Sequence, residues 1–161
     1  MASRLTRRRS QSGLTTVEFS IIGSVLFMVL FGVIEFGYAL FVVNTLTEAT
    51  RRGARMAAVC QVGDPTPASV AVFDSGNGTS TVIYGLTTSD VEIDYLDASG
   101  AVIADPSSNF GLIRYVRAKI VNFQLPLMIP FVMPTLQLSG FSATIPRESL
   151  GVLPSGAIQP C

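Results

Sequence analysis

A long apolar run near the N-terminus is the feature that most constrains this chain. Residues 19–43 are 25 positions with one charged side chain, Glu35. As an α-helix the run would be about 37 Å long, which is enough to cross the ~30 Å hydrocarbon core of a bilayer. It is longer than the apolar core of a cleaved secretory signal, and no small-residue cleavage site follows it. We therefore predict a transmembrane helix over residues 19–43 that stays in the mature protein.

Arginines on the N-terminal side of this run predict its orientation. The first 13 residues contain no acid and four arginines, Arg4, Arg7, Arg8 and Arg9. Basic residues next to the first span resist translocation, so we expect this segment to stay in the cytoplasm. Arg51, Arg52 and Arg55 flank the other side, but they lie about two helical turns beyond the run and do not reverse this expectation.

Helical periodicity continues beyond the apolar run. Mostly small residues recur every three or four positions and form one face: Leu46, Ala49, Gly53, Met56, Ala57 and Cys60. Charged residues occupy the other face, where Glu48 precedes Arg52 by four positions, the favourable order for a helical ion pair. We predict one helix over residues 14–60 whose small-residue face packs on the protein's own domain. A packing seam to a neighbouring subunit is the alternative.

Residues 61–161 change to the short alternating pattern of β-strands. Gly63, Pro65 and Pro67 are expected to end the helix. The expected strands are residues 81–84, 91–96, 115–123 and 136–145, separated by turn sequences at 74–78, 98–100 and 105–109. The apolar, proline-containing residues 126–134 are expected to form a loop that packs on the sheet or on a partner. The predicted fold class is α+β, with a long N-terminal transmembrane helix followed by a small antiparallel β-sheet domain.

Residues suited to catalysis or metal binding are scarce. The chain has no His and only two Cys, and its 11 basic residues balance its 11 acidic residues. Asp90, Glu92 and Asp94 alternate with apolar residues, which we interpret as a solvated strand face, with a calcium site as the alternative. Ser–Lys chemistry with Lys119, the only lysine, is the one enzymatic alternative. We expect no catalysis, no metal, no cofactor and no nucleic-acid partner.

The two cysteines stand at the end of the predicted helix and at the end of the chain. A disulfide persists in the oxidising compartments outside the cytoplasm. We therefore predict a bridge between Cys60 and Cys161, with two unpaired thiols as the alternative. The bridge would close a loop of about 100 residues and would stabilise the fold by ~4–5 kcal/mol in the chain-entropy model.

The start of the apolar run resembles the processing site of a class III prepilin. In Gly13-Leu-Thr-Thr-Val-Glu18-Phe19, a glycine precedes a glutamate by five positions. In such sites a membrane peptidase cuts after the glycine, and the glutamate becomes fifth in the mature chain. Residues 32–37 and 49–55 resemble the next blocks of the TadE-like pseudopilins of tight-adherence (Tad), or type IVc, secretion systems. Residues 144–148 are similar to the end of that family's domain.

The resemblance implies three segments. They are a basic leader over residues 1–13, a pilin-type helix over 14–60 with its transmembrane part at 19–43, and an outward-facing β-rich domain over 61–161. Members of the family often carry a proline near Ser24, and this chain has none there. We therefore expect a straighter helix.

The resemblance also implies roles for individual residues. Cutting between Gly13 and Leu14 would remove the four leader arginines and create an α-amino group at Leu14. Glu18 would meet the new amino terminus of a neighbouring subunit, because pairing lowers the cost of both charges in an apolar bundle. Ser20 and Ser24 would allow close helix approach. Glu35 would mark the outward-facing interface of the membrane that the helix spans, or a polar contact between helices, and the sequence leaves both open.

The implied function is that of a minor pilin, or pseudopilin, in Tad pilus assembly and surface adherence. Its expected location is the bacterial inner membrane, in a single pass with a cytoplasmic N-terminus and a periplasmic domain, and later the cell surface within the pilus. The expected partners are a prepilin peptidase, other Tad pilin and pseudopilin subunits, the inner-membrane assembly platform and membrane lipid. An unprocessed single-pass anchor that carries a small extracytoplasmic binding module is the alternative.

Overall fold

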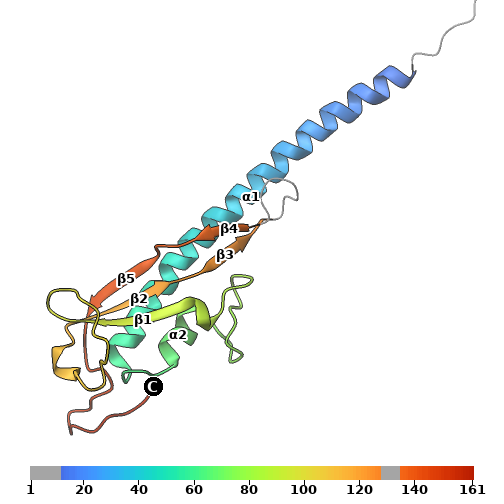
Figure 1. The fold of residues 1–161 in the computed structure, drawn as a ribbon. Helices are drawn as coiled ribbons and strands as arrows, with labels where there is room; N and C mark the ends of the chain where they lie inside the picture. Colours follow the sequence, from blue (N-terminus) through green and yellow to red (C-terminus); the bar gives the residue numbers. More distant parts are fainter. Residues whose placement is uncertain (1–11, 128–134) are drawn as a thin grey trace, which may run out of the picture.

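The computed structural model describes residues 12–127 and 135–161, and it combines one long helix with a small sheet domain (Figure 1). The helices are α1 (Ser12–Val59), α2 (Thr66–Ala71) and the 3-10 turns η1 (Thr88–Asp90) and η2 (Phe110–Leu112). The strands are β1 (Val91–Leu96), β2 (Tyr115–Ile120), β3 (Phe123–Pro126), β4 (Thr135–Leu138) and β5 (Ser142–Pro146). The predicted α+β class, with a long apolar helix before small antiparallel sheets, is confirmed.

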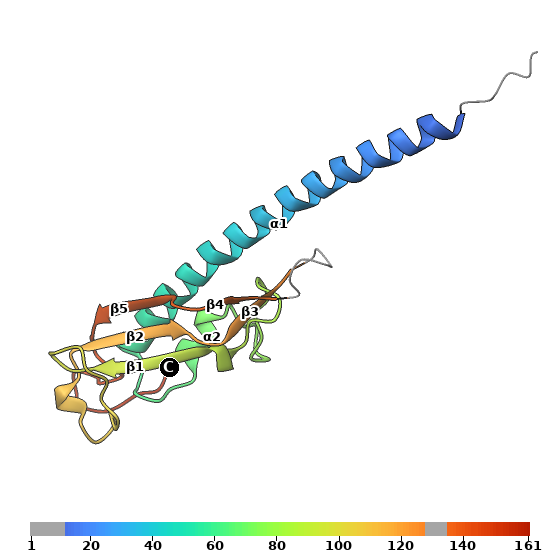
Figure 2. The same cartoon turned by 45° about the horizontal axis from the view of Figure 1, so that its top comes forward.

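α1 is a single element of 48 residues. No proline occurs between Ser12 and Val59, so nothing removes a backbone donor or blocks a turn within it. The helix begins two residues before the predicted start and ends at Val59. Its N-terminal half projects alone, while its C-terminal half lies against the sheet domain (Figures 1 and 2).

The small-residue face of α1 packs on the chain's own domain. Leu46, Ala49 and Ala57 are fully buried. At Gly53 an added Cβ would lie 2.9 Å from the Ala71 Cβ and 3.3 Å from the Ala118 Cβ. Such distances leave no room for a side chain, so glycine allows α2 and β2 to approach the helix closely.

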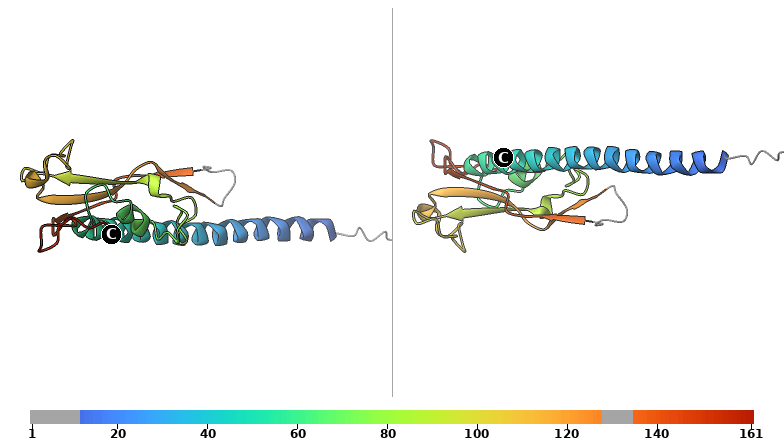
Figure 3. Two further views of the ribbon diagram at one scale, coloured as in Figure 1. Left: turned by 90° about the horizontal axis from the view of Figure 1, so that it is seen from below. Right: turned by 90° about the horizontal axis from the view of Figure 1, so that it is seen from above.

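Two antiparallel sheets form the domain. β1, β2 and β5 make a three-stranded sheet in the order β1-β2-β5, and β3 pairs with β4 in a separate hairpin. In the larger sheet Asp94 lies opposite Arg117 and Glu92 opposite Lys119. Seen from above and below, this sheet covers one side of the C-terminal half of α1 (Figure 3).

Several predicted strands differ from the structure. The predicted strand at 81–84 is wrong, because the Ser80 hydroxyl oxygen accepts hydrogen bonds from the backbone N–H groups of Val82 and Ile83 and makes a turn. The predicted strands 115–123 and 136–145 are each broken, at Asn122 with φ 58° and at Gly140 with φ 89°. Asn122 turns the chain out of the larger sheet and into the β3–β4 hairpin, and Gly140 turns it from the hairpin back into the larger sheet.

The segment that ends α1 also starts a helix that the sequence pattern did not predict. Pro65 and Pro67 open α2, where a missing N–H costs little. The Asp64 carboxylate accepts a 2.8 Å hydrogen bond from the Thr66 N–H. Of the predicted apolar loop at 126–134, residues 128–134 lie outside the described part of the chain. Leu127, at its start, packs against the core.

Two hydrophobic clusters attach α1 to the sheets. One joins Val42 and Leu46 of α1 to Phe123 and Leu125 of β3. The other surrounds Ala57 near the end of the helix, with Tyr95, Ile113, Val116 and Leu150. The packing of α1 on the domain therefore extends from the last turns of the apolar run to the helix C-terminus.

The C-terminal tail donates hydrogen bonds to the last backbone carbonyl groups of α1. The N–H groups of Glu148 and Leu150 donate to the Ala58 carbonyl, and the Gly151 N–H donates to the Val59 carbonyl at 2.7 Å. These carbonyls have no partner within the helix, so the tail acts as its cap. A disulfide joins Cys60 to Cys161, and the two Cα atoms are 5.4 Å apart.

We predict that Cys161→Ser lowers the free energy of unfolding by ~4–5 kcal/mol, because the unfolded chain loses a cross-link across about 100 residues. Urea titration of the detergent-solubilised full-length chain, followed by tyrosine fluorescence, measures the change. Dithiothreitol should reproduce it in the unmodified chain and should have no effect on Cys161→Ser. Equal stability of the two proteins under oxidising conditions would contradict the prediction.

Candidate functional site

The projecting half of α1 exposes a continuous apolar surface. Phe19 is 77% exposed, Ile22 69% and Met28 75%. This helix is long and apolar enough to cross a membrane, and its most apolar window has no buried residue. A surface of this size and length requires lipid or protein around it. One long apolar N-terminal helix therefore fits a membrane anchor.

The predicted processing residues lie in the first turn of this projecting half. Gly13 is exposed, and a Cβ added to it would meet no atom within 4 Å. Leu14 follows it in the same helical turn. The peptide bond between them is therefore at the free end of the helix, far from the sheet domain.

Glu18 lies one turn after Leu14. Its side chain is exposed, and among the described residues no ion pair includes it. The nearby hydroxyls of Ser20 and Ser24 donate to backbone carbonyls four residues earlier, each at 2.8 Å. The hydroxyl groups of both serines are therefore hydrogen-bonded within the helix. The surface next to the accessible Glu18 carboxylate consists of small side chains that need no outside hydrogen-bond partner.

Among the side chains of α1 that the structure describes, Glu35 is the first that is buried. It is 9% exposed, whereas its neighbours Ile34 and Phe36 are 58% and 67% exposed. Glu35 therefore stands where the projecting half of the helix gives way to the half that the domain covers.

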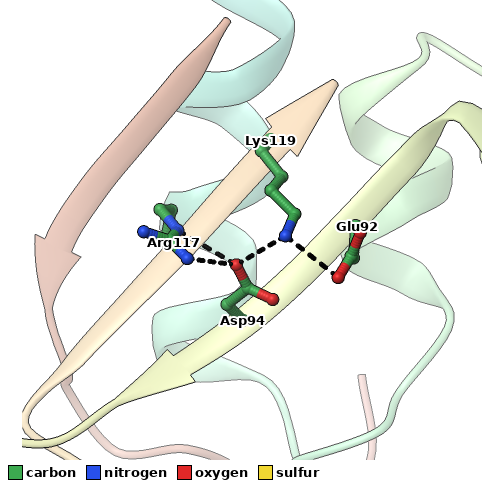
Figure 4. Close-up of polar contacts among 4 residues, drawn as sticks. All are labelled: Glu92, Asp94, Arg117 and Lys119. Atoms are coloured by element: carbon green, nitrogen blue, oxygen red, sulfur yellow. Dashed lines mark hydrogen bonds and ion pairs between the residues drawn. The ribbon is translucent and has the colours of Figure 1, made fainter. Parts of the chain in front are cut away.

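An ion-pair network lies on the sheet face that points away from α1 (Figure 4). The Asp94 Oδ2 atom accepts hydrogen bonds from the Arg117 guanidinium at 2.6 and 3.0 Å, and it lies 3.1 Å from the Lys119 Nζ. The same Nζ lies 3.0 Å from Glu92. β1 supplies the two acids and β2 supplies the two bases, in the register of the sheet.

This network corrects the prediction of a solvated acidic face. Asp94 is 6% exposed, whereas Glu92 is 52% exposed at its side chain. Asp90 does not belong to the strand: it ends η1, where its carboxylate accepts hydrogen bonds from the Thr87 N–H and hydroxyl. The alternation of Arg117 and Lys119 on the neighbouring strand was the signal that could have identified the network.

Burial acts to raise the pKa of Asp94, but hydrogen bonds from Arg117 and Lys119, together with their charges, outweigh it and hold the pKa below its ordinary value. Hydrogen bonds to Glu92 and Asp94 raise the pKa of Lys119. A lysine that acts as a general base needs a lowered pKa. The environment of Lys119 therefore favours an ion-pairing role over Ser–Lys chemistry.

The residues singled out by the sequence do not form one site. Gly13, Leu14 and Glu18 lie at one end of α1, while the Cys60–Cys161 bridge lies at the other, roughly 60 Å away along the helix. Within the described ranges, no group of three His, Cys, Asp or Glu residues could hold a metal ion. The arrangement offers an exposed helix for association and a separate, internally paired sheet domain.

Comparison with known proteins identifies the same N-terminal segment. The model of the TadE-like protein family matches residues 13–55. No curated protein and no solved structure matches the chain. The family resemblance seen in the sequence is confirmed over residues 13–55, a range that ends before the sheet domain.

We predict that Asp94→Asn lowers the free energy of unfolding by about 1–3 kcal/mol at pH 7, because it leaves two half-buried cations without the negative charge that they share. Glu92→Gln, which removes the exposed partner of the same lysine, should cost less than about 1 kcal/mol. Urea titrations of both variants measure these losses. Equal effects of the two substitutions would contradict the assigned roles.

The effect of Asp94 should also depend on pH. Its pKa in the folded protein lies below its ordinary value of 3.8, so its stabilisation is complete above that value and is lost as pH falls through the folded pKa. The stability difference between the unmodified chain and Asp94→Asn should therefore shrink as pH is lowered from 5 toward about 2. A difference that stays constant over this range would contradict the depressed pKa.

Proposed function

On the premise of a TadE-like N-terminal segment, we propose that this protein is a minor pilin, or pseudopilin, of a Tad-type pilus. The observation that carries the proposal is the exposed, apolar half of α1 with the processing motif at its free end. A helix of this kind can occupy a membrane first and a bundle of like helices later, because both surroundings are apolar.

The precursor is a single-pass protein of the bacterial inner membrane. Its arginine-rich leader lies in the cytoplasm and its sheet domain lies in the periplasm. The disulfide between Cys60 and Cys161 supports an oxidising location for the domain. After assembly the domain would be presented at the cell surface in the pilus, where it contributes to adherence.

A prepilin peptidase cuts the precursor after Gly13. The cut removes four arginines and leaves an α-amino group on Leu14, one helical turn before Glu18. The position of this bond at the free end of α1 supports the proposal, because no part of the described domain lies near it.

Glu18 then pairs with the α-amino terminus of a neighbouring subunit. Both groups sit at the start of the apolar half of the helix. An isolated charge costs ~2.5–3.5 kcal/mol on insertion scales at the centre of a spanning helix, and less toward its ends. Pairing offsets part of this cost, and because each charge has one place on its helix, it also fixes the axial register between subunits. The neighbours are other Tad pilin and pseudopilin subunits, delivered at the inner-membrane assembly platform.

The sheet domain has no catalytic role in this proposal. Its one lysine, Lys119, is held by two carboxylates. Its buried acid, Asp94, forms an ion pair with Arg117 on the neighbouring strand. The domain presents a surface and gives α1 a rigid end.

We expect mass spectrometry of the membrane-extracted protein to find Leu14 as the first residue in cells that contain the peptidase. Gly13→Ala should abolish cutting, and the added methyl group should not disturb the fold because it meets no atom within 4 Å. Gly23→Ala is the matched control: it adds the same methyl to the same helix, also without contact, and should be cut normally. Normal cutting of Gly13→Ala, or an intact Met1 or Ala2 start, would favour the unprocessed anchor.

We expect Glu18→Gln to leave cutting intact and to abolish or greatly reduce incorporation into pili, because the new amino terminus then lacks its negatively charged partner. Immunoblotting of sheared surface pili measures incorporation. Glu48→Gln, at a half-buried acid farther along α1 that pairs with Arg52, is the control and should assemble normally. Normal incorporation of Glu18→Gln would contradict the pairing role.

A further inference from the structure

The larger sheet and the β3–β4 hairpin are separated by a matched break in two neighbouring segments of the chain. β2 leads into β3, and β4 leads back into β5 (Figure 1). The Ile120 N–H donates to the Phe141 carbonyl at 2.9 Å on one side of the break, and the β3–β4 pairing begins on the other. Between them no register pair joins residues 121–122 to residues 139–140. The two segments therefore part at the same place.

A hollow of about 440 Å³ opens at this break. Its walls include Asn122 and Gly140, which have left-handed φ values of 58° and 89°. A residue other than glycine is uncommon in this conformation, and such residues cluster at ligand sites. The volume lies within the ~300–1,000 Å³ range of small-molecule sites. The backbone geometry thus creates a space that a small ligand can fill.

The polar side chains around the hollow are rich in hydrogen-bond donors and include no acid. They come from β2, β4, β5 and the link between β4 and β5: Arg117, Lys119, Gln137, Ser139 and Ser142. Arginine and lysine only donate hydrogen bonds, whereas the amide and hydroxyl groups both donate and accept. This combination suits a ligand that carries one anionic group together with several hydroxyl groups.

The ion-pair network beside the hollow holds its two cations in place (Figure 4). The side chains of Arg117 and Lys119 are each 29% exposed. Asp94 accepts hydrogen bonds from the Nε and Nη2 atoms of Arg117, so Nη1 is the guanidinium nitrogen outside those bonds. Because Asp94 and Glu92 already balance the two cations, a second negative charge on a ligand would be repelled. A single carboxylate is the anion that fits, and a guanidinium already held in place loses little side-chain freedom on binding it.

Apolar groups lie next to these polar side chains. Val121 and Phe141 are half-buried and line the same hollow. Small-molecule sites combine apolar or aromatic walls with a few placed polar groups, because the apolar surface takes up the carbon atoms of the ligand. The hollow can therefore contact both the polar substituents and the carbon skeleton of one molecule.

We propose that this hollow binds a small hydroxylated carboxylate, of the class represented by the uronic acid residues of acidic polysaccharides. The carboxylate contacts Arg117 and Lys119, the hydroxyl groups exchange hydrogen bonds with Gln137 and the two serines, and the carbon skeleton lies against Phe141. The inference goes beyond the proposed function and does not depend on it, because the hollow belongs to the sheet domain of the cut and the uncut chain alike.

Saturation-transfer NMR on the detergent-solubilised full-length chain tests the ligand class with three probes. Methyl β-D-glucuronide carries both the sugar ring and the carboxylate, methyl β-D-glucoside carries the ring without the carboxylate, and N-acetylglycine carries the carboxylate without the ring. The glucuronide should bind at least about tenfold more tightly than either of the others, because each of them lacks one set of hydrogen bonds.

The other outcomes overturn the proposal in different ways. Equal affinity for the glucuronide and the glucoside would remove the role of the carboxylate. Equal affinity for the glucuronide and N-acetylglycine would show a general carboxylate or peptide-end site in place of a saccharide site. Failure of all three probes to bind would remove the site altogether.

Two substitutions test the location. Arg117→Lys keeps a cation beside Asp94 but removes the guanidinium fork, and Gln137→Ala removes an exposed amide that lies outside the ion-pair network. Arg117→Lys should weaken glucuronide binding about tenfold, and Gln137→Ala should weaken it several-fold. Gln137→Ala keeps the test decisive even if Arg117→Lys disturbs the fold.

Arg114→Lys and Gln124→Ala are the matched controls. Arg114 is exposed just before β2, and Gln124 lies opposite Gln137 in the hairpin, but neither lines the hollow. Both variants should bind the glucuronide as the unmodified chain does, and urea titration checks that every variant is folded. Unchanged binding by Gln137→Ala and folded Arg117→Lys, or equal losses in the controls, would overturn the site. Cutting after Gly13 is measured separately, so failure of the pilin proposal and failure of this inference give different results.

Discussion

One uninterrupted helix must fit two different surroundings, an apolar medium around its N-terminal half and the protein's own domain around its C-terminal half. The rest of the structure depends on this constraint. The backbone of α1 satisfies its own hydrogen bonds, which is the condition for a segment that enters lipid. Its N-terminal half carries large apolar side chains on all faces, whereas its C-terminal half carries a face of small residues. The first half can be surrounded by any apolar medium, but the second half admits only its own domain, because Gly53 and Ala57 allow α2 and the sheet to approach it closely.

The C-terminal end of α1, which lies in the domain, is held more firmly than the projecting N-terminal end. The carbonyls of Ala58 and Val59 receive N–H groups from the C-terminal tail, and the disulfide closes the tail onto Cys60. A force or a contact applied at Glu18 is therefore transmitted along one continuous helix to the end of α1 that the tail and the disulfide hold. This arrangement is what a subunit needs if its helix sets its position in an assembly and its domain faces outward.

The sequence predicted the features that local patterns control. The span of α1 followed from apolar composition and the absence of proline, and Val91–Leu96 followed from strict alternation. The same reasoning failed where one residue changes the backbone direction, as at Asn122 and Gly140, since a strand-like composition continues across both.

The environment of individual side chains was harder to predict, because it depends on distant parts of the chain. Asp94 is buried beneath Arg117, a residue 23 positions away whose pairing depends on strand register. Likewise, the composition of 19–43 could not show that its last turns belong to the domain, because apolar residues fit lipid and protein equally well. The candidate processing and pairing residues came from a motif, and the structure adds the exposure of Gly13 and Glu18 and the separation of this end of α1 from the domain.

The central claim is that Glu18 is tolerated in an apolar helix because cutting supplies a cationic partner on a neighbouring subunit. Zero-length carbodiimide cross-linking of assembled pili tests this contact directly, with subunits mixed from isotopically light and heavy cultures to distinguish contacts between chains from contacts within one. We expect an amide between the Glu18 carboxyl of one chain and the Leu14 α-amino group of another. A Leu14 amine that is free, or that is joined to a different carboxyl, would contradict it.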